Sequence, residues 1–245
     1  RLGSSTYKLD STAFPDGAYL KRNDLLGRLN VTTGSGDTDG DGDFDEIHAL
    51  GGRSFSIWDA NTGVQVWDSG DDFERITAVD PNYGSLFNAS NSNNTFKNRS
   101  DDKGPEPEGV TVAEIEGRQY AFIVLERIGG VMLYDISNPS SPQFIQYINS
   151  RQLGSTTGGD LGPEGILFIP KANSPNGRNL LVVSNEISGS VSVFQINVDK
   201  TNTDYDLTKF TLDNTPLITQ TDDSLNIYEG GISGLHYREG TFHLV

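Results

Sequence analysis

Short runs of hydrophobic residues, some continuous and some alternating with polar residues, dominate the chain and predict β-strands. Residues 120–125 and 179–184 are nearly continuous apolar runs, which is the pattern of strands covered on both faces. Each is followed by an alternating run, at residues 130–135 and 190–196. Long apolar stripes at helical spacing are absent from the sequence, so the pattern predicts an all-β protein rather than a helical bundle or solenoid.

This arrangement of runs recurs along the chain, in residues 46–69, 109–149 and 165–200. The tetrapeptides FSIW, VMLY and VSVF take the same place in the three segments. Repeats of this length, with strand-sized pieces joined by tight turns, are typical of β-propeller blades with loop insertions. We therefore expect part of a WD-repeat-like β-propeller. A β-sandwich is the structural alternative.

Two polar stretches interrupt the strand pattern and predict long loops. Residues 82–103 are rich in Asn and Ser and nearly free of aliphatic side chains, and residues 154–159 contain only Gly, Ser and Thr. Loops of this length are either functional or mobile.

Composition limits the partners. The chain has 34 acidic and 18 basic residues and a formal net charge of -16, so its surface repels nucleic acid and anionic membranes and attracts divalent cations. It has no cysteine and no apolar run long enough to span a membrane. These features favour a secreted bacterial protein. Because the chain begins at Arg1 rather than Met, we expect a fragment of a longer protein.

The most specific motif is an acidic loop at residues 37–45, DTDGDGDFD. Ca²⁺ prefers six to eight hard oxygen ligands, and acids at alternate positions can wrap oxygens around one ion. Gly42 permits the sharp turn, but His48 stands where an EF-hand needs its closing Glu, and a strand pattern follows directly. We expect a structural Ca²⁺ site in a loop between strands; the alternative is a solvated acidic turn that binds no ion. The candidate ligands are Asp37, Asp39, Asp41, Asp43 and Asp45.

A second motif is a recurring glutamate step. It occurs as Pro107-Glu108-Gly109 and Pro163-Glu164-Gly165, with a looser copy at Glu229-Gly230, and a second Glu follows the first two copies, at Glu126 and Glu186. In a propeller these steps would begin the innermost strands and meet at the central channel. Clustered carboxylates there would need a cation or would have raised pKa values. The alternative is that each Glu accepts backbone N–H bonds that fix its turn.

With these residues in hand, the chain resembles the choice-of-anchor I family of extracellular β-propellers. The resemblance implies a propeller that is seven-bladed when complete, of which about three to four blades are present. The resemblance rests on the segments GDTDGDGDFDEIHALGGRSFSIWD, DKGPEPEGVTV, YAFIVLERIGGVMLYDISNP, GPEGILFIP and LLVVSNEISGSVSVFQI. The acidic loop also resembles the calcium loops of integrin α-subunit propellers, which implies side-chain ligands from Asp37, Asp39, Asp41 and Asp45 and a carbonyl ligand from Asp43. The last 20 or so residues resemble the start of a phytase-like esterase propeller. We therefore expect one domain over residues 1–216 and the last strands or a following propeller over residues 217–245.

The resemblance implies two functions. The first is a calcium-stabilised module of a secreted or surface-anchored bacterial protein, whose partners include calcium and other surface or matrix components. The second is a secreted calcium-dependent phosphomonoesterase, because some members of the family are described as atypical alkaline phosphatases. In that case phosphate esters are the substrates, and the site is lined by Glu108, Glu126, Glu164, Glu186, Lys103 and Arg127.

Overall fold

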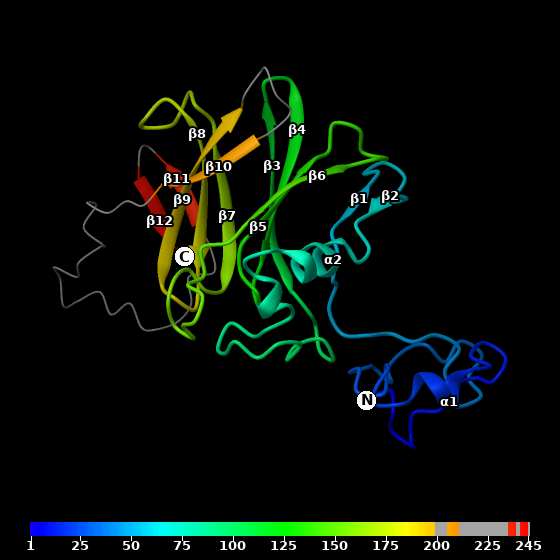
Figure 1. Cartoon of the computed structure of the whole chain (residues 1–245). Helices are drawn as coiled ribbons and strands as arrows, with labels where there is room; N and C mark the ends of the chain where they lie inside the picture. The colour runs from blue at the N-terminus through cyan, green and yellow to red at the C-terminus, as the bar shows by residue number, and fades with distance from the viewer. Residues whose placement is uncertain (199–204, 211–234, 239–240, 245) are drawn as a thin grey trace, which may run out of the picture.

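The computed structural model describes residues 1–198, 205–210, 235–238 and 241–244, and these residues are mostly β-structure (Figure 1). Its main feature is a pair of four-stranded antiparallel sheets, each made of strands that are consecutive in the sequence. The first sheet contains β3 (Pro107–Ile115), β4 (Arg118–Leu125), β5 (Val131–Asp135) and β6 (Gln143–Ile148). The second contains β7 (Pro163–Ile169), β8 (Asn179–Asn185), β9 (Ser190–Val198) and β10 (Tyr205–Phe210).

The predicted strands are confirmed where the apolar pattern is strongest. Residues 120–125 of β4 and all of β5 are buried, because other elements cover both faces of the first sheet. Strand β3 instead alternates between buried or half-buried and exposed side chains, as expected of a strand with one uncovered face. Residues 179–184 and 190–196 likewise fall within β8 and β9.

The two sheets pack against each other through one hydrophobic core. Phe122, Val124 and Leu133 of the first sheet belong to the same buried cluster as Leu181 and Phe194 of the second. Strand β3 also contacts β7, so the first strands of the two sheets lie side by side (Figure 1).

The opposite face of the first sheet is covered by residues that precede it in the sequence. Helix α2 (Asp72–Val79) places Phe73 against Ile123 and Tyr134, and the 3-10 helix η1 (Gly84–Leu86) adds Leu86. The hairpin of β1 (Ser56–Trp58) and β2 (Gln65–Asp68) contributes Phe55 and Trp67 to the same core. Residues 46–69 therefore form a two-stranded hairpin rather than a unit as large as the two sheets. Helix α2 is not predicted by the sequence pattern, because a helix of about two turns is too short to establish a 3.6-residue period.

The N-terminal part of the chain, including the short helix α1 (Gly17–Leu20), lies apart from the two sheets (Figure 1). The prediction of a strand directly after the acidic loop is wrong. Residues 46–54 form a single bridge, between Ala49 and Val31, and the next strand begins at Ser56. The segment is largely exposed, and Gly51-Gly52 has no side chains that could pack against a neighbouring strand. Glycine weakens a strand for this reason.

Strands β11 (Leu235–Arg238) and β12 (Thr241–Leu244) form a further hairpin. The expected domain boundary at residues 216 and 217 and the third glutamate step at Glu229-Gly230 lie outside the described residues. Within the described part of the chain, no helix is long and apolar enough to cross a membrane.

Candidate functional site

Both glutamate steps form β-bulges at the start of a sheet. Pro107 pairs with Leu125 and Gly109 with Val124, so Glu108 is an extra residue with no partner of its own. The second sheet repeats this geometry: Pro163 pairs with Asn185 and Gly165 with Ser184, which leaves Glu164 as the extra residue. A bulge re-aims the side chain of its extra residue and increases the local twist. The repeated sequence motif therefore corresponds to a β-bulge that occurs at the same place in both sheets.

The two bulges lie beside each other. A Cβ atom placed on Gly109 would be 2.3 Å from the carbonyl oxygen of Glu164, so the backbones of β3 and β7 are in contact at this point. Gly109 does not have a positive φ. Glycine is therefore required here for space rather than for backbone conformation.

The following glutamates are placed by matching backbone hydrogen bonds. The N–H of Glu126 donates to the carbonyl of Glu106 (2.8 Å), and the N–H of Glu186 donates to the carbonyl of Gly162 (2.7 Å). Because these bonds join backbone to backbone, the turns are fixed without the glutamate side chains. The carboxyl groups remain available for other contacts.

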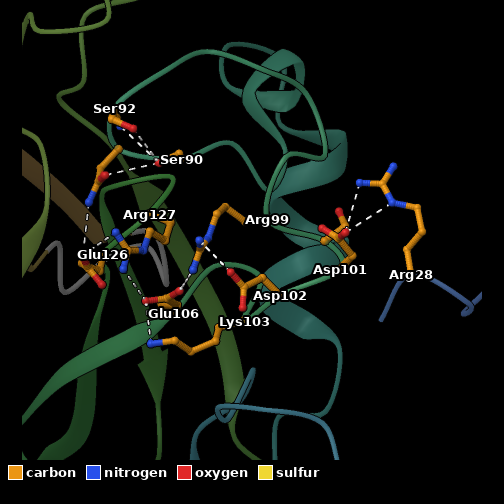
Figure 2. A network of polar contacts seen from close by, with 12 residues as sticks. Arg28, Ser90, Ser92, Arg99, Asp101, Asp102, Lys103, Glu106, Glu126 and Arg127 are labelled. Carbon is orange, nitrogen blue, oxygen red and sulfur yellow. Dashed lines mark hydrogen bonds and ion pairs between the residues drawn. The ribbon is translucent and has the colours of Figure 1, made fainter. Parts of the chain in front are cut away.

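Glu106, which the sequence analysis did not select, is the centre of the polar network in Figure 2. Its side chain is 2% exposed and lies 2.5 Å from Arg99, 3.0 Å from Arg127 and 3.2 Å from Lys103. Its φ of 50° is in the left-handed region, which is unusual for Glu. The only signal in the sequence was its position two residues before Glu108 within a segment rich in acids.

Glu126 lies next to Glu106 and is also buried, at 8% exposure. Its Oε1 accepts a hydrogen bond from Asn91 (3.1 Å). The same oxygen lies 3.0 Å from Arg127 (Figure 2). Burial raises the pKa of Glu126 to about 7, and the neighbouring Glu106 adds to this effect while Arg127 opposes it. Burial would also raise the pKa of Glu106, but hydrogen bonds from Arg127 and Arg99 outweigh it and hold that pKa at about 2. One carboxyl of the pair is therefore ionised and the other keeps a proton over a wide range of pH.

The remaining carboxyl groups extend the cluster toward the second sheet. Oxygens of Glu106, Glu108 and Glu126 lie within 4.8 Å of one another. Burial raises the pKa of Glu164, and the charges of Glu186 and Glu108 raise it further. We call this group the glutamate cluster; it contains Glu106, Glu108, Glu126, Glu164 and Glu186 with Arg99, Lys103 and Arg127. Five carboxyl groups thus face three cations.

The long polar segment at residues 82–103 is built into the structure rather than being a free loop. Asn88 is 1% exposed, and its amide donates to Glu74 (2.6 Å) and Ser100 (3.0 Å). Arg151, also 1% exposed, donates to the carbonyls of Ser90 (2.9 Å) and Asn93 (2.8 Å). These contacts position the segment so that it delivers Asn91, Arg99 and Lys103 to the glutamate cluster.

The acidic loop brings three of its five carboxylates together. Oxygens of Asp37, Asp39 and Asp45 lie within 4.8 Å of one another. Asp37 accepts backbone hydrogen bonds from Gly40 (2.7 Å) and Gly42 (3.1 Å), whose φ angles of 80° and 96° allow the tight turns. Oxygen atoms alone make up this donor set, which fits a hard cation such as Ca²⁺. Asp41 lies outside the group of three, and its Oδ1 accepts the backbone N–H of Asp43 (3.1 Å).

The pKa values of Asp43 and Asp45 in the acidic loop are shifted in opposite directions. Partial loss of solvent raises the pKa of Asp43, and the charges of Asp41 and Asp10 add to this effect. The pKa of Asp45 is lowered instead, because the backbone and hydroxyl of Thr38 both donate to its carboxylate.

Residues 7–10 connect the acidic loop to the rest of the N-terminal part of the chain. Asp10 donates its N–H to the carbonyl of Phe44 (3.1 Å), and Phe44 donates to Lys8 (3.0 Å). The ring of Tyr7 stacks on Phe44 with a centroid distance of 4.1 Å. No motif in the sequence links Asp10 to the loop, because Asp10 lies 27 residues before Asp37. A change in the geometry of the loop would therefore reach residues 7–10.

The sequence predicted two separate sites, and the structure keeps them separate. Lys103, Glu108, Glu126 and Arg127 lie in one charged network with Glu106, and Glu164 and Glu186 adjoin it from the second sheet. The acidic loop belongs to the N-terminal part of the chain, which lies apart from the two sheets that carry this network (Figure 1).

Comparisons with known proteins agree with the resemblance found in the sequence. Residues 2–139 match the family model of the choice-of-anchor I domain. The chain is also similar to Gigasin-3a of Magallana gigas, with 31% identity over 192 residues, which covers 72% of this chain and 66% of that protein. The match therefore spans slightly less than two thirds of the relative. No solved structure matches the chain.

Proposed function

Because the chain belongs to the choice-of-anchor I domain family, we propose that it is a calcium-binding β-propeller module of a secreted or surface-anchored bacterial protein. Membership of this family points to an extracellular protein. The calcium assignment rests on the acidic loop, where three carboxylate groups lie close together. Among their described contacts there is no Lys, Arg or His side chain that would balance their charge.

The propeller assignment is supported by the arrangement of the two sheets. Each is a meander of four strands, the two meanders pack face to face, and their first strands lie side by side. Neighbouring blades of a propeller have this arrangement around a central axis.

Calcium content tests the proposal directly. We expect chain that has been equilibrated with Ca²⁺ and then desalted to retain about one ion, because a loop of this kind supplies one set of hard ligands. The double variant Asp37→Asn, Asp39→Asn should retain none, as measured by plasma mass spectrometry. Asp16→Asn is the matched control, since Asp16 is exposed and its side chain makes no cap hydrogen bond. Equal calcium in the double variant and the wild type would refute the assignment.

A second candidate is the calcium-dependent phosphomonoesterase, and one observation favours it. Glu126 has a pKa of about 7 and lies beside Arg127, and a carboxyl of that pKa suits general acid–base catalysis at neutral pH. Against it, Arg127, Lys103 and Arg99 are already paired with Glu106. A phosphate group would have to compete with that buried carboxylate.

Hydrolysis of p-nitrophenyl phosphate separates the two candidates. If the chain is a calcium-binding module without catalytic activity, we expect the wild type to show no turnover above the rate of a Glu126→Gln variant, with or without Ca²⁺. Calcium-dependent turnover that is lost in Glu126→Gln and kept in Glu114→Gln would establish the esterase instead. Glu114 is a suitable control because it is exposed on the same strand as Glu108.

A further inference from the structure

We propose that the outer face of the β1–β2 hairpin is a docking surface for a basic segment of another protein, in which Trp58 and Asp68 bind one Arg or Lys side chain of that segment. The surface lies apart from the acidic loop (Figure 1) and does not belong to the glutamate cluster. The proposed interaction therefore does not depend on calcium.

The hairpin is fixed to the molecule by its inner face. Phe55 and Trp67 pack in the hydrophobic core that covers the first sheet. Strands β1 and β2 form a sheet of their own, with no third strand in the described part of the chain. The hairpin is therefore held in place on one side and presents its outer face to solvent.

Four side chains share this outer face. Trp58 is paired with Gln65, and Ser56 is paired with Asp68. Residues directly opposite each other in an antiparallel pair point to the same side, and so do alternate residues of one strand. A hydrogen bond from the amide of Gln65 to the hydroxyl of Ser56 (3.3 Å) agrees with this arrangement.

Trp58 makes this face unusual, because 58% of its surface is exposed. Val64 and Val66 of the same hairpin are also exposed. Tryptophan is enriched at the centres of protein interfaces, where its large ring is buried against the partner. Covering Trp58 would therefore contribute favourably to binding.

Acidic residues surround the hairpin and are only partly balanced by cations. Residues 54–74 contain five acidic side chains and no Lys, Arg or His. The flanking Arg53 and Arg75 pair with two of the five, both in helix α2. Asp59 and Asp68 have neutral donors only among their described contacts. The surface thus has negative charge that a partner could neutralise.

Asp68 is held beside Trp58 by neutral donors. Its Oδ2 accepts hydrogen bonds from Ser54 (3.1 Å), Ser56 (2.5 Å) and Gln65 (3.3 Å). The bond from Gln65 is longer than usual, so an incoming cation can replace it. Because Gln65 lies directly opposite Trp58, that cation would also lie beside the indole ring.

This combination suits a basic side chain. The apolar stem of Arg or Lys packs on an aromatic ring, and its charged group is attracted both by the ring face and by a carboxylate. A further sheet of the propeller fits less well, because the two large sheets meet through apolar residues such as Phe122 and Leu181. The net charge of -16 attracts a basic partner and opposes a second copy of this chain.

Fluorescence anisotropy tests the surface with a labelled synthetic peptide in which glycine and arginine alternate. At about 0.15 M salt, charges farther than about 8 Å from the peptide are largely screened. We expect Trp58→Ala to weaken binding about tenfold, which is the effect of one partly desolvated cation–π contact. Asp68→Asn, which keeps the shape of the side chain, should weaken it about threefold, as expected of an exposed ion pair.

Tyr19→Ala and Asp16→Asn are the matched controls. They remove an exposed aromatic ring and an exposed carboxylate from the N-terminal part of the chain, and both should bind the peptide as the wild type does. Unchanged binding in Trp58→Ala, or equal weakening in Trp58→Ala and Tyr19→Ala, would overturn the proposal. Tighter binding of cellohexaose than of the peptide, or self-association that Trp58→Ala abolishes, would also overturn it.

A second measurement uses the wild-type chain and does not depend on any variant. The chain has two tryptophans, and Trp67 packs against the core. Addition of the peptide should shift the NMR signal of the Trp58 indole N–H and leave that of Trp67 in place. If the Trp58 signal does not move at saturating peptide, the proposal is wrong.

Discussion

Removing calcium should lower the melting temperature of the chain by about 5–10 °C. An ion present at 100 times its dissociation constant stabilises the folded state by about 2.7 kcal/mol, and 1 kcal/mol corresponds to about 2–4 °C in a chain of this size. The physical reason is the cost of holding Asp37, Asp39 and Asp45 within 4.8 Å of one another without a cation. Differential scanning calorimetry with Ca²⁺ and with EDTA measures the effect.

Variants locate this effect in the loop. Asp39→Ala should have the low melting temperature of the EDTA-treated wild type and should not respond to EDTA. Asp37 is a less suitable choice, because it also accepts the backbone bonds from Gly40 and Gly42 that shape the loop. Asp16→Ala should behave as the wild type. An unchanged melting temperature in EDTA would refute a structural role for calcium.

Replacing Gly109 by alanine should destabilise the chain by about 3 kcal/mol, near the upper end of the usual cost of overpacking. The new methyl group would lie 2.3 Å from the carbonyl oxygen of Glu164 and 3.0 Å from a methyl of Val124. Because the first neighbour is backbone, relief requires β3 and β7 to move apart. Urea unfolding of the variant, followed by circular dichroism, gives the change in free energy.

Gly52→Ala provides the control. Gly52 has no atom within 4 Å of the position of its Cβ and does not have a positive φ, so the substitution should change the free energy of unfolding by less than about 0.5 kcal/mol. If Gly109→Ala is as mild as Gly52→Ala, the first strands of the two sheets do not touch as described. The propeller proposal would then lose its main support.

The strands were predictable because burial on both faces leaves a strong local signal. Residues 120–125 and 179–184 are apolar in the sequence because other elements cover both sides of β4 and β8. The hairpin of β1 and β2 turns through residues 61–63, where Gly63 has a φ of 69°. Helix α2 was not predictable because it is too short to establish a helical period. The absence of a strand after the acidic loop was not predictable because it depends on which partner strand is nearby.

The glutamate steps were recognised as a repeat, but their meaning required the register of the strands. A sequence shows that Glu108 and Glu164 share a context, whereas only the pairing of β3 with β4 and of β7 with β8 shows that both are bulge residues. Glu106 was missed for a similar reason. Its three cations come from residues 99, 103 and 127, and nothing local marks them as its partners.

The acidic loop was the clearest signal in the sequence, because its five carboxylates lie within nine residues and need no long-range contact to meet. The structure adds its attachment through Phe44 to residues 7–10. It also distinguishes Asp37, Asp39 and Asp45, whose oxygens converge, from Asp41 and Asp43. The calcium proposal therefore rests on three named carboxylates rather than on acidic composition.

A crystal structure of the calcium-saturated chain would show directly whether the acidic loop binds calcium. We expect one ion at the loop, about 2.3–2.6 Å from carboxylate oxygens of Asp37, Asp39 and Asp45. We also expect the ion to be absent from crystals of Asp39→Ala grown under the same conditions. A wild-type loop that contains only water at saturating calcium would refute the calcium proposal.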